Sequence, residues 1–310
     1  IGQGLAFLNH YLCDKLLTDP QYWLAAIFKA LHTIEYDGIQ LLTNDQIHSG
    51  VELSQQVKQA LKFLGDQSPE DPAATVHLDL QALGFEPGWG NTIVRVSETL
   101  ELLNRLIDDP EPAILEAFVS RVPAVFRVVL ISIHGWVGQA DVMGRSETRS
   151  QVAYVLEQAA SLEQQLRAEL QQAGLDLLGI QPQVIVLTRL IPNCTETQCS
   201  LPFEQIDGTE NAWILRVPFQ EFNPHVTQHW ISKFEIWPYL ESFANDAEPA
   251  LLAHLGGRPN LIIGHYSDGN LVASTVTTEE LQYPGGQAVK PMRSVGPDDF
   301  HRRREARWRD

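Results

Sequence analysis

A histidine and a glycine end an apolar run in the stretch VVLISIHGWVGQADVMGRSETRSQVAYVLEQA, from Val128 to Ala159. The β-branched run stops at His134–Gly135, a polar loop follows, and a helical pattern begins near Gln151. A loop between a strand and a helix is where α/β proteins hold anions, because the first N–H groups of the helix have no partner inside it. The imidazole of His134 could hydrogen-bond a ligand at this place. Alternatively, His134 only caps the end of the strand.

Two further apolar runs also end in polar residues. Thr188–Arg189 end one run, and Asp268 and Asn270 follow the other in GHYSDGN. Because the carboxyl ends of parallel strands meet at one edge of a sheet, these residues are predicted to share a cleft with His134. Asp and Asn also cap helices, and for SDGN the residues alone favour the cap.

The first part of the chain, residues 1–122, is predicted to be helical throughout. In TIVRVSETLELLNRLIDD, apolar residues recur at spacings of three and four and form one stripe on a helix face that ends before Pro110. GFEPGWGN is predicted to be a turn in which Trp89 packs against neighbours. This part resembles a packing or assembly module. The stripe consists of Ile93, Val96, Leu100, Leu103 and Ile107.

The apolar period changes at Pro123, where strands begin to alternate with helices. This alternation predicts an α/β fold with a parallel, doubly wound sheet over residues 123–274. After Ser274 neither period continues, so residues 275–310 are predicted to be an irregular tail that arises by truncation, a reading-frame break or divergence. The predicted strands lie near residues 126–132, 183–188, 212–217 and 260–265.

Composition excludes several classes of function. The formal net charge of −17 argues against a nucleic-acid partner, which would need clustered Lys and Arg. No run of about 18 apolar residues occurs, so no membrane span is predicted. The three cysteines, Cys13, Cys194 and Cys199, indicate a reducing, cytoplasmic compartment and lack the partners of a metal site. Ile1 begins no signal peptide, and we expect the chain to start inside a longer protein.

Several stretches, in this order, resemble the sucrose synthase family of retaining nucleotide-sugar glycosyltransferases. The resemblance runs from about residue 1 to about residue 274. It implies a helical module followed by the acceptor-side, Rossmann-like lobe of a two-lobed GT-B enzyme. It also implies a homo-oligomer, a tetramer in the family, and no cofactor. The stretches are GLAFLNHYLCDKL, GFEPGWGNT, SRVPAVFRVVLISIHGW, VIVLTRLIPN, GTEN, ILRVPF, WISKFEIWPYLE and LIIGHYSDGNLVAS.

The resemblance assigns roles to the residues of the predicted cleft. His134 is implied to hydrogen-bond the sugar at the reacting centre, and the loop before the helix to contact the diphosphate of the donor. The implied substrates are sucrose or fructose and UDP- or ADP-glucose. The implied substrate-binding residues are Gly135, Gln139, Gly144, Thr148, Arg149, Ser150, Gln151, Lys233, Asp268 and Asn270.

Three departures from the family pattern bear on activity. Residues 147–151 stand where the family has Asp-Thr-Gly-Gly-Gln, so Arg149 and Ser150 occupy space that glycines leave for the diphosphate, although Arg149 could pair with a phosphate. Lys233 replaces an Arg that helps to hold fructose. The second lobe of the family is not recognisable after Ser274. Two hypotheses follow: reversible transfer of glucose between a nucleoside diphosphate and fructose, or a truncated, non-catalytic folding and oligomerisation module. This chain alone is predicted to be inactive.

Overall fold

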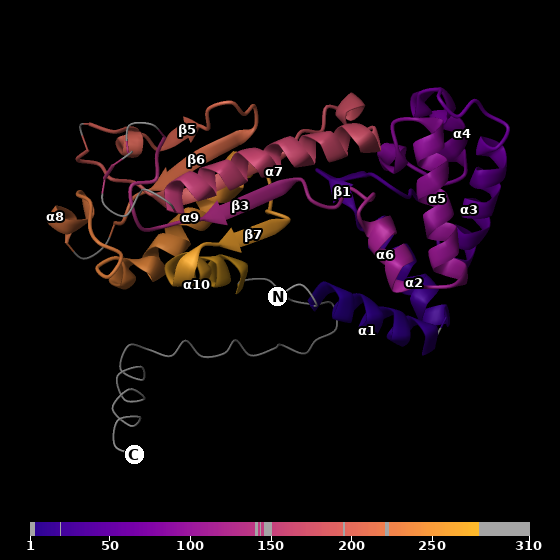
Figure 1. The fold of residues 1–310 in the computed structure, drawn as a ribbon, viewed down its shortest axis with the longest axis horizontal. Coiled ribbons are helices and arrows are strands. Elements are labelled where there is room, and N and C mark those ends of the chain that lie inside the picture. The colour runs from indigo at the N-terminus through magenta and orange to yellow at the C-terminus, as the bar shows by residue number, and fades with distance from the viewer. Residues whose placement is uncertain are drawn as a thin grey trace, which may run out of the picture.

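The fold has two parts, a helical module and an α/β lobe, which lie side by side (Figure 1). Helix α7 (Gln151–Ala173) belongs to the lobe and reaches the module at its C-terminal end. No helix in the described part of the chain is long and apolar enough to cross a membrane. The computed structural model describes residues 4–18, 20–139, 142, 144–145, 151–194, 196–220 and 223–278.

The helical module buries a core of aliphatic and aromatic side chains between its helices. Two short 3-10 turns, η1 (Ala73–Val76) and η2 (Pro87–Trp89), connect them. The helices are α1 (Gly4–Thr18), α2 (Pro20–His32), α3 (Gly50–Leu64), α4 (His77–Ala82), α5 (Ile93–Asp108) and α6 (Pro112–Val119).

Helix α5 shows how the sequence specifies this module. The Thr92 hydroxyl accepts a hydrogen bond from a backbone N–H of the first turn, which caps the helix start. The predicted stripe is buried over residues 93–103. At its end Leu106 is fully buried and Ile107 only partly, and Trp23 of α2 donates its indole N–H to Leu106 O at 3.0 Å.

The prediction of helices throughout residues 1–122 is wrong at one place. Strands β1 (Glu35–Tyr36) and β2 (Ile39–Gln40) form an antiparallel hairpin between α2 and α3. Asp37 and Gly38 both have positive φ, at 50° and 80°, as the two central residues of a tight hairpin turn require. The Asp-Gly pair was therefore a local signal for a hairpin, but its strands are too short to show an alternating pattern.

Trp89 is a packing residue of the module, as predicted. Its side chain is 1% exposed, its ring meets Phe85 edge-on at 5.6 Å between centroids, and its Nε1–H donates to Leu42 O at 2.8 Å. Leu42 O also accepts the N–H of Glu86. The indole thus links the turn at η2 to the chain that follows the hairpin.

We expect Trp89→Phe to lower the free energy of unfolding by about 1–2 kcal/mol, the loss of one hydrogen bond plus a small cavity. The loss is limited because Leu42 O keeps its bond from Glu86. Urea unfolding monitored by circular dichroism would measure it. Trp237→Phe is the control, since Trp237 is 44% exposed, and a change of less than about 0.5 kcal/mol is expected there. Equal effects of the two substitutions would contradict the packing role.

The α/β lobe contains a five-stranded sheet with the order β5-β6-β4-β3-β7. Strands β3, β4, β6 and β7 are parallel, which confirms the prediction of parallel strands at these four places. Strand β5 is an addition to the prediction: it pairs antiparallel with β6 at the edge and is too short to show a period. The strands are β3 (Arg127–Ile131), β4 (Gln183–Arg189), β5 (Phe203–Gln205), β6 (Ala212–Val217) and β7 (Leu261–Gly264).

Both faces of the sheet are covered by helices, which explains why the strands are apolar without alternation. Leu130 of β3 packs on the α7 face, and the next residue, Ile131, packs on the opposite face. Helices α9 (Leu240–Leu255) and α10 (Tyr266–Thr278) cover that opposite face. Shorter segments lie in the connections: η4 (Asp176–Leu178), η5 (Gln198–Ser200), α8 (Pro224–Thr227) and η6 (Trp237–Tyr239).

The module and the lobe share a small core where they meet. Leu41, Phe126 and Leu170 are all buried in it. An ion pair between Asp37 Oδ1 and Arg127 Nη2, at 2.6 Å, joins the hairpin turn to the start of β3. The two parts are therefore connected by packing as well as by the chain.

The lobe extends beyond its predicted end at Ser274. Helix α10 continues to Thr278, so the irregular tail does not begin at residue 275. Residues 279–310 lie outside the described residues, and the predicted tail remains a prediction there.

Candidate functional site

The strand order of the sheet defines where a ligand would bind. From β3 the chain passes through α7 to β4 on one side, whereas β7 lies on the other side of β3. Helix α7 covers one face, and α10, which follows β7, covers the other. In open α/β sheets the ligand crevice forms at the carboxyl ends of the strands where the order reverses in this way. The residues after β3 and β7 are therefore the candidates.

His134 and Asp268, two of the residues predicted to share a cleft, meet at this switch point. His134 Nδ1 lies 2.8 Å from Asp268 Oδ2, and the backbone N–H of His134 donates to the same oxygen at 3.3 Å. Both residues are 4% exposed. The preference for Asp268 as a helix cap is wrong, because its carboxylate is turned to the residue after the neighbouring strand.

The turn between β7 and α10 brings Asp268 to this place. Tyr266 has a φ of 59°, an uncommon value for a residue with a side chain, and it starts the helix immediately after the strand. A Cβ on Gly269 would lie 2.4 Å from Ile131 O, and one on Gly264 would lie 2.6 Å from the Cα of Asn270. Gly269 thus lets α10 approach β3 closely, and Gly264 lets it pack closely on β7. This packing of backbone on backbone sets the distance between His134 and the helix.

A cavity of about 340 Å³ opens at the switch point, between the start of α7 and the turn before α10. His134 contacts its wall through Tyr266, whose ring it meets edge-on at 5.0 Å between centroids. Thr188 is 1% exposed inside the sheet, and neither it nor His134 nor Asp268 lines this cavity. The prediction that these three residues line one cleft is therefore not confirmed. The cavity is lined by Gln151, Tyr154, Gly264, His265 and Tyr266.

Two polar side chains of the cavity differ in how they are held. Gln151, the first residue of α7, donates its amide to Ser132 Oγ at 3.1 Å, which links the helix start to the end of β3. His265 Nε2 is buried and has no hydrogen-bond partner among the described residues. Burial lowers the pKa of the His265 imidazole below its ordinary value, because the charged form loses its hydration. His265 is therefore neutral at physiological pH.

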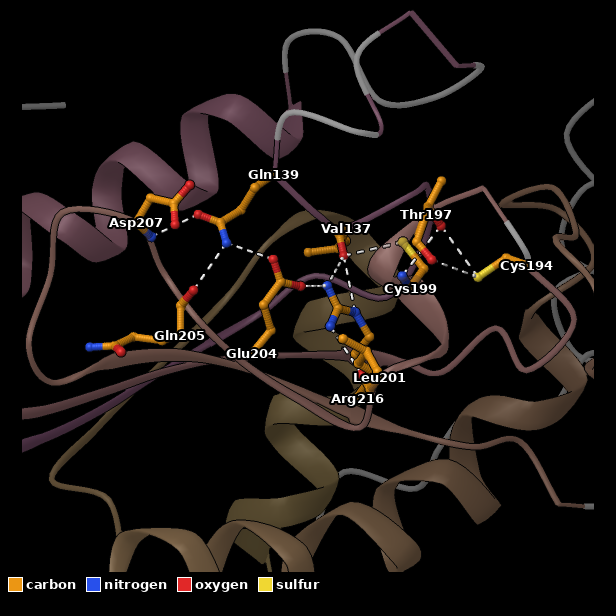
Figure 2. Close-up of polar contacts among 10 residues, drawn as sticks. All are labelled: Val137, Gln139, Cys194, Thr197, Cys199, Leu201, Glu204, Gln205, Asp207 and Arg216. Carbon is orange, nitrogen blue, oxygen red and sulfur yellow. Dashed lines mark hydrogen bonds and ion pairs between the residues drawn. The ribbon is translucent and has the colours of Figure 1, made fainter.

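A buried ion pair supports the loop that follows His134. Arg216 of β6 and Glu204 of β5 form it, with side chains 0% and 6% exposed. Arg216 also donates to Val137 O from Nη2 at 2.9 Å and to Leu201 O from Nη1 at 3.0 Å (Figure 2). The Cys199 thiol lies 3.6 Å from the same Val137 oxygen. These contacts fix the backbone of the loop just after His134–Gly135.

Gln139 belongs to this network and does not reach His134. Its amide nitrogen donates to Glu204 Oε1 at 2.6 Å and to Gln205 O at 3.0 Å, and its amide oxygen accepts the N–H of Asp207 at 2.7 Å (Figure 2). All of these partners lie on or beside β5. The amide is thus committed to holding the loop against the edge of the sheet.

The remaining predicted site residues are placed as follows. Gly135 and Gly144 have positive φ, at 87° and 94°, which favours glycine at both positions. The Lys233 amine lies 5.2 Å from the ring centre of Phe234. The Asn270 amide donates to Tyr266 O within its own helix at 2.7 Å. Thr148, Arg149 and Ser150 lie outside the described residues.

Three residues of the site carried no signal that the sequence revealed. Glu204 and Arg216 meet only because β5 and β6 are antiparallel neighbours, and no local pattern reports such a pairing. Tyr266 stands in a strand-to-helix turn whose length and φ could not be read in advance.

Among the described residues, no group of three or more His, Cys, Asp and Glu is placed to hold a metal ion.

Comparison with known proteins gives two matching family models and a series of relatives. The model described as "Sucrose synthase first GT-B domain" matches residues 113–284, and "Sucrose synthase EPBD domain" matches residues 3–91. Sucrose synthase of Thermosynechococcus vestitus is 57% identical over 273 residues, and that of Melioribacter roseus is 44% identical over 273 residues. Sucrose synthase 2 of Arabidopsis thaliana is 40% identical over 279 residues. The matches cover 88%, 88% and 90% of this chain but 34% of each relative, so the chain spans about a third of their length.

Proposed function

Because this chain belongs to the sucrose synthase family, we propose that its α/β lobe is the acceptor side of a retaining glycosyltransferase. The reaction is the reversible transfer of glucose between a nucleoside diphosphate, UDP or ADP, and fructose. The observation that carries the proposal is the pairing of His134 with Asp268 at the switch point of the sheet, inside the segment that matches the first GT-B domain. A ligand crevice is expected at that edge.

In this proposal His134 orients the sugar at the reacting centre. In the direction of sucrose synthesis, the bond between the glucosyl carbon and the diphosphate oxygen breaks through an oxocarbenium-like state. The fructose hydroxyl oxygen bonds to the same carbon, and its proton passes to the leaving diphosphate. Alignment of the two substrates supplies roughly 7–11 kcal/mol of barrier lowering, and hydrogen bonds aimed at developing charge add to it. No electrons are transferred, so the reaction needs no redox cofactor.

The other site residues divide into two groups under this proposal. The loop over residues 144–151 contacts the diphosphate, more weakly than in the family because Arg149 and Ser150 replace glycines, and Lys233 contacts the fructose unit. Gln139 supports the loop, since its amide is already bonded to Glu204 and its neighbours. Asn270 stabilises the start of α10 through Tyr266 O.

We further propose that residues 1–122 form a separate assembly module of a cytoplasmic homo-oligomer, with the glycosyltransferase lobe starting at residue 123. The EPBD match over residues 3–91 and the helical core of that part support a module with its own packing. Its shared core with the lobe would hold the lobe at a defined orientation.

The proposal is tested by placing this chain in the context of a complete relative. The matching segment of the Thermosynechococcus protein is replaced by this chain's segment, and fructose release from sucrose with UDP or ADP is measured. We expect turnover by the chimaera. The 310-residue chain alone is the control, and we expect it to release no detectable fructose, because the matched segment supplies only one lobe. A folded chimaera without turnover would contradict the proposal.

In the active chimaera, we expect His134→Ala to lower kcat at least about 100-fold, the effect of removing one hydrogen bond made to a transition state. His48→Ala is the matched control and should leave kcat unchanged, since His48 is an exposed residue of the helical module. If the kcat of His134→Ala stayed within a few-fold of the kcat of the unsubstituted chimaera, His134 would have no role at the reacting centre.

A further inference from the structure

The imidazole of His134 meets the carboxylate of Asp268 through its Nδ1 nitrogen. We propose that Asp268 is a positioning residue that holds the imidazole of His134 with its proton on Nδ1. Any hydrogen bond from the ring to a sugar is then made through Nε2. This inference rests on the proposed function for its purpose, but the state of the ring can be measured without any substrate.

The charge state of the partner determines which nitrogen carries the proton. An ionised carboxylate accepts hydrogen bonds and donates none, so Nδ1, at 2.8 Å from Oδ2, must be protonated. The backbone N–H of His134 donates to the same oxygen, at 3.3 Å, which adds a second donor to the carboxylate. The hydrogen bond made by one ring nitrogen sets the state of the other.

Burial makes this arrangement effective. The side chains of His134 and Asp268 are 5% and 6% exposed, so water competes little for either group. A hydrogen bond is electrostatically stronger in such surroundings than in water. Tyr266 packs its ring edge-on against the imidazole and restricts rotation of the ring.

The backbone fixes the distance between the two groups. Ile131 O accepts the N–H of His265 at 2.8 Å, and the Cα of Gly269 packs closely on the same carbonyl. Asp268 lies next to Gly269, and His134 follows Ile131 by three residues. The backbone segments that carry the two side chains are therefore held close together at one carbonyl group.

The test uses the 310-residue chain labelled with ¹⁵N-histidine. Nitrogen-15 NMR at about pH 8, above the ordinary titration range of imidazole, distinguishes protonated from unprotonated ring nitrogens. The signals of His134 are assigned by their loss in His134→Gln. We expect Nδ1 of His134 to be protonated in the unaltered chain. A His134 ring protonated only on Nε2 would overturn the proposal.

Asp268→Asn adds a second reading. The amide can donate to Nδ1, and we expect the proton to shift from Nδ1 to Nε2, whereas Asp66→Asn, at an exposed aspartate of the helical module, should change nothing. If the proton stayed on Nδ1 of His134 in folded Asp268→Asn, the positioning role of Asp268 would be contradicted. If that variant does not fold, the spectrum of the unaltered chain still decides. Adding fructose tests the proposed function separately. A change in the ¹⁵N chemical shift of His134 Nε2 reports sugar binding, whatever the result for Asp268.

Discussion

Arg216→Met is expected to lower the free energy of unfolding of the α/β lobe by about 3–5 kcal/mol, the cost of leaving one partner of a buried ion pair alone. Arg216 is completely buried, and its loss leaves the Glu204 carboxylate, which is only 6% exposed, without an opposite charge. It also removes the donors to Val137 O and Leu201 O. An uncompensated charge in the interior is costly, and so is a buried carbonyl that loses its N–H donors.

Urea unfolding of Arg216→Met and of a matched control variant, monitored by circular dichroism, measures this effect. The matched control is Lys58→Met, which breaks an ion pair with Asp108 at 3.3 Å between two half-exposed side chains. Surface pairs of this kind contribute about 0–1 kcal/mol. A loss below about 1 kcal/mol for Arg216→Met would mean that the ion pair contributes little and that the loop after His134 is held by other contacts.

Gly269→Ala is expected to lower the free energy of unfolding by about 3 kcal/mol, at the upper end for inserting a carbon into a packed interior. The new Cβ would lie 2.4 Å from Ile131 O, a backbone atom of β3, which is paired on both sides and cannot turn aside. Helix α10 must therefore move away from β3, and Asp268 moves with it. The same substitution should lengthen the contact between Asp268 and His134.

Gly65→Ala is the control for this prediction. Its Cβ would make ordinary contacts at 3.5 Å, and its φ of −62° suits any residue, so the stability should stay the same or rise by about 0.4–1 kcal/mol. Urea midpoints compare the two variants, and the ¹⁵N signal of His134 reports the displaced helix. Equal stability of the two variants would show that α10 can shift without cost.

The sequence by itself was sufficient to locate the four parallel strands and the helices between them. Burial on both faces selects uninterrupted apolar runs such as VVLI and VIVL, and burial on one face selects the spacing seen in α5. These patterns are local, so they can be read without knowing what each element packs against. The same reasoning placed His134 and Asp268 at one edge of the sheet, because parallel strands bring their carboxyl ends together.

Local patterns are less informative for short elements. Hairpin β1–β2 and edge strand β5 contain too few residues to repeat a period, and only the Asp37–Gly38 turn signalled one of them. The failure to predict edge strand β5 also affected the prediction of the site. Without β5, the partners of Gln139 and Arg216 could not be foreseen.

Tertiary structure alone decided what the polar side chains at the sheet edge do. Asp268 could have capped its own helix, and Gln139 could have faced a ligand, since a carboxylate or an amide bonds equally well to near or distant partners. The close approach of α10 to β3 placed His134 Nδ1 within 2.8 Å of Asp268, and β5 placed Glu204 within 2.6 Å of Gln139. A polar group takes the partner that the packed backbone holds in reach, and that backbone is set by glycines, strand order and burial across the whole lobe.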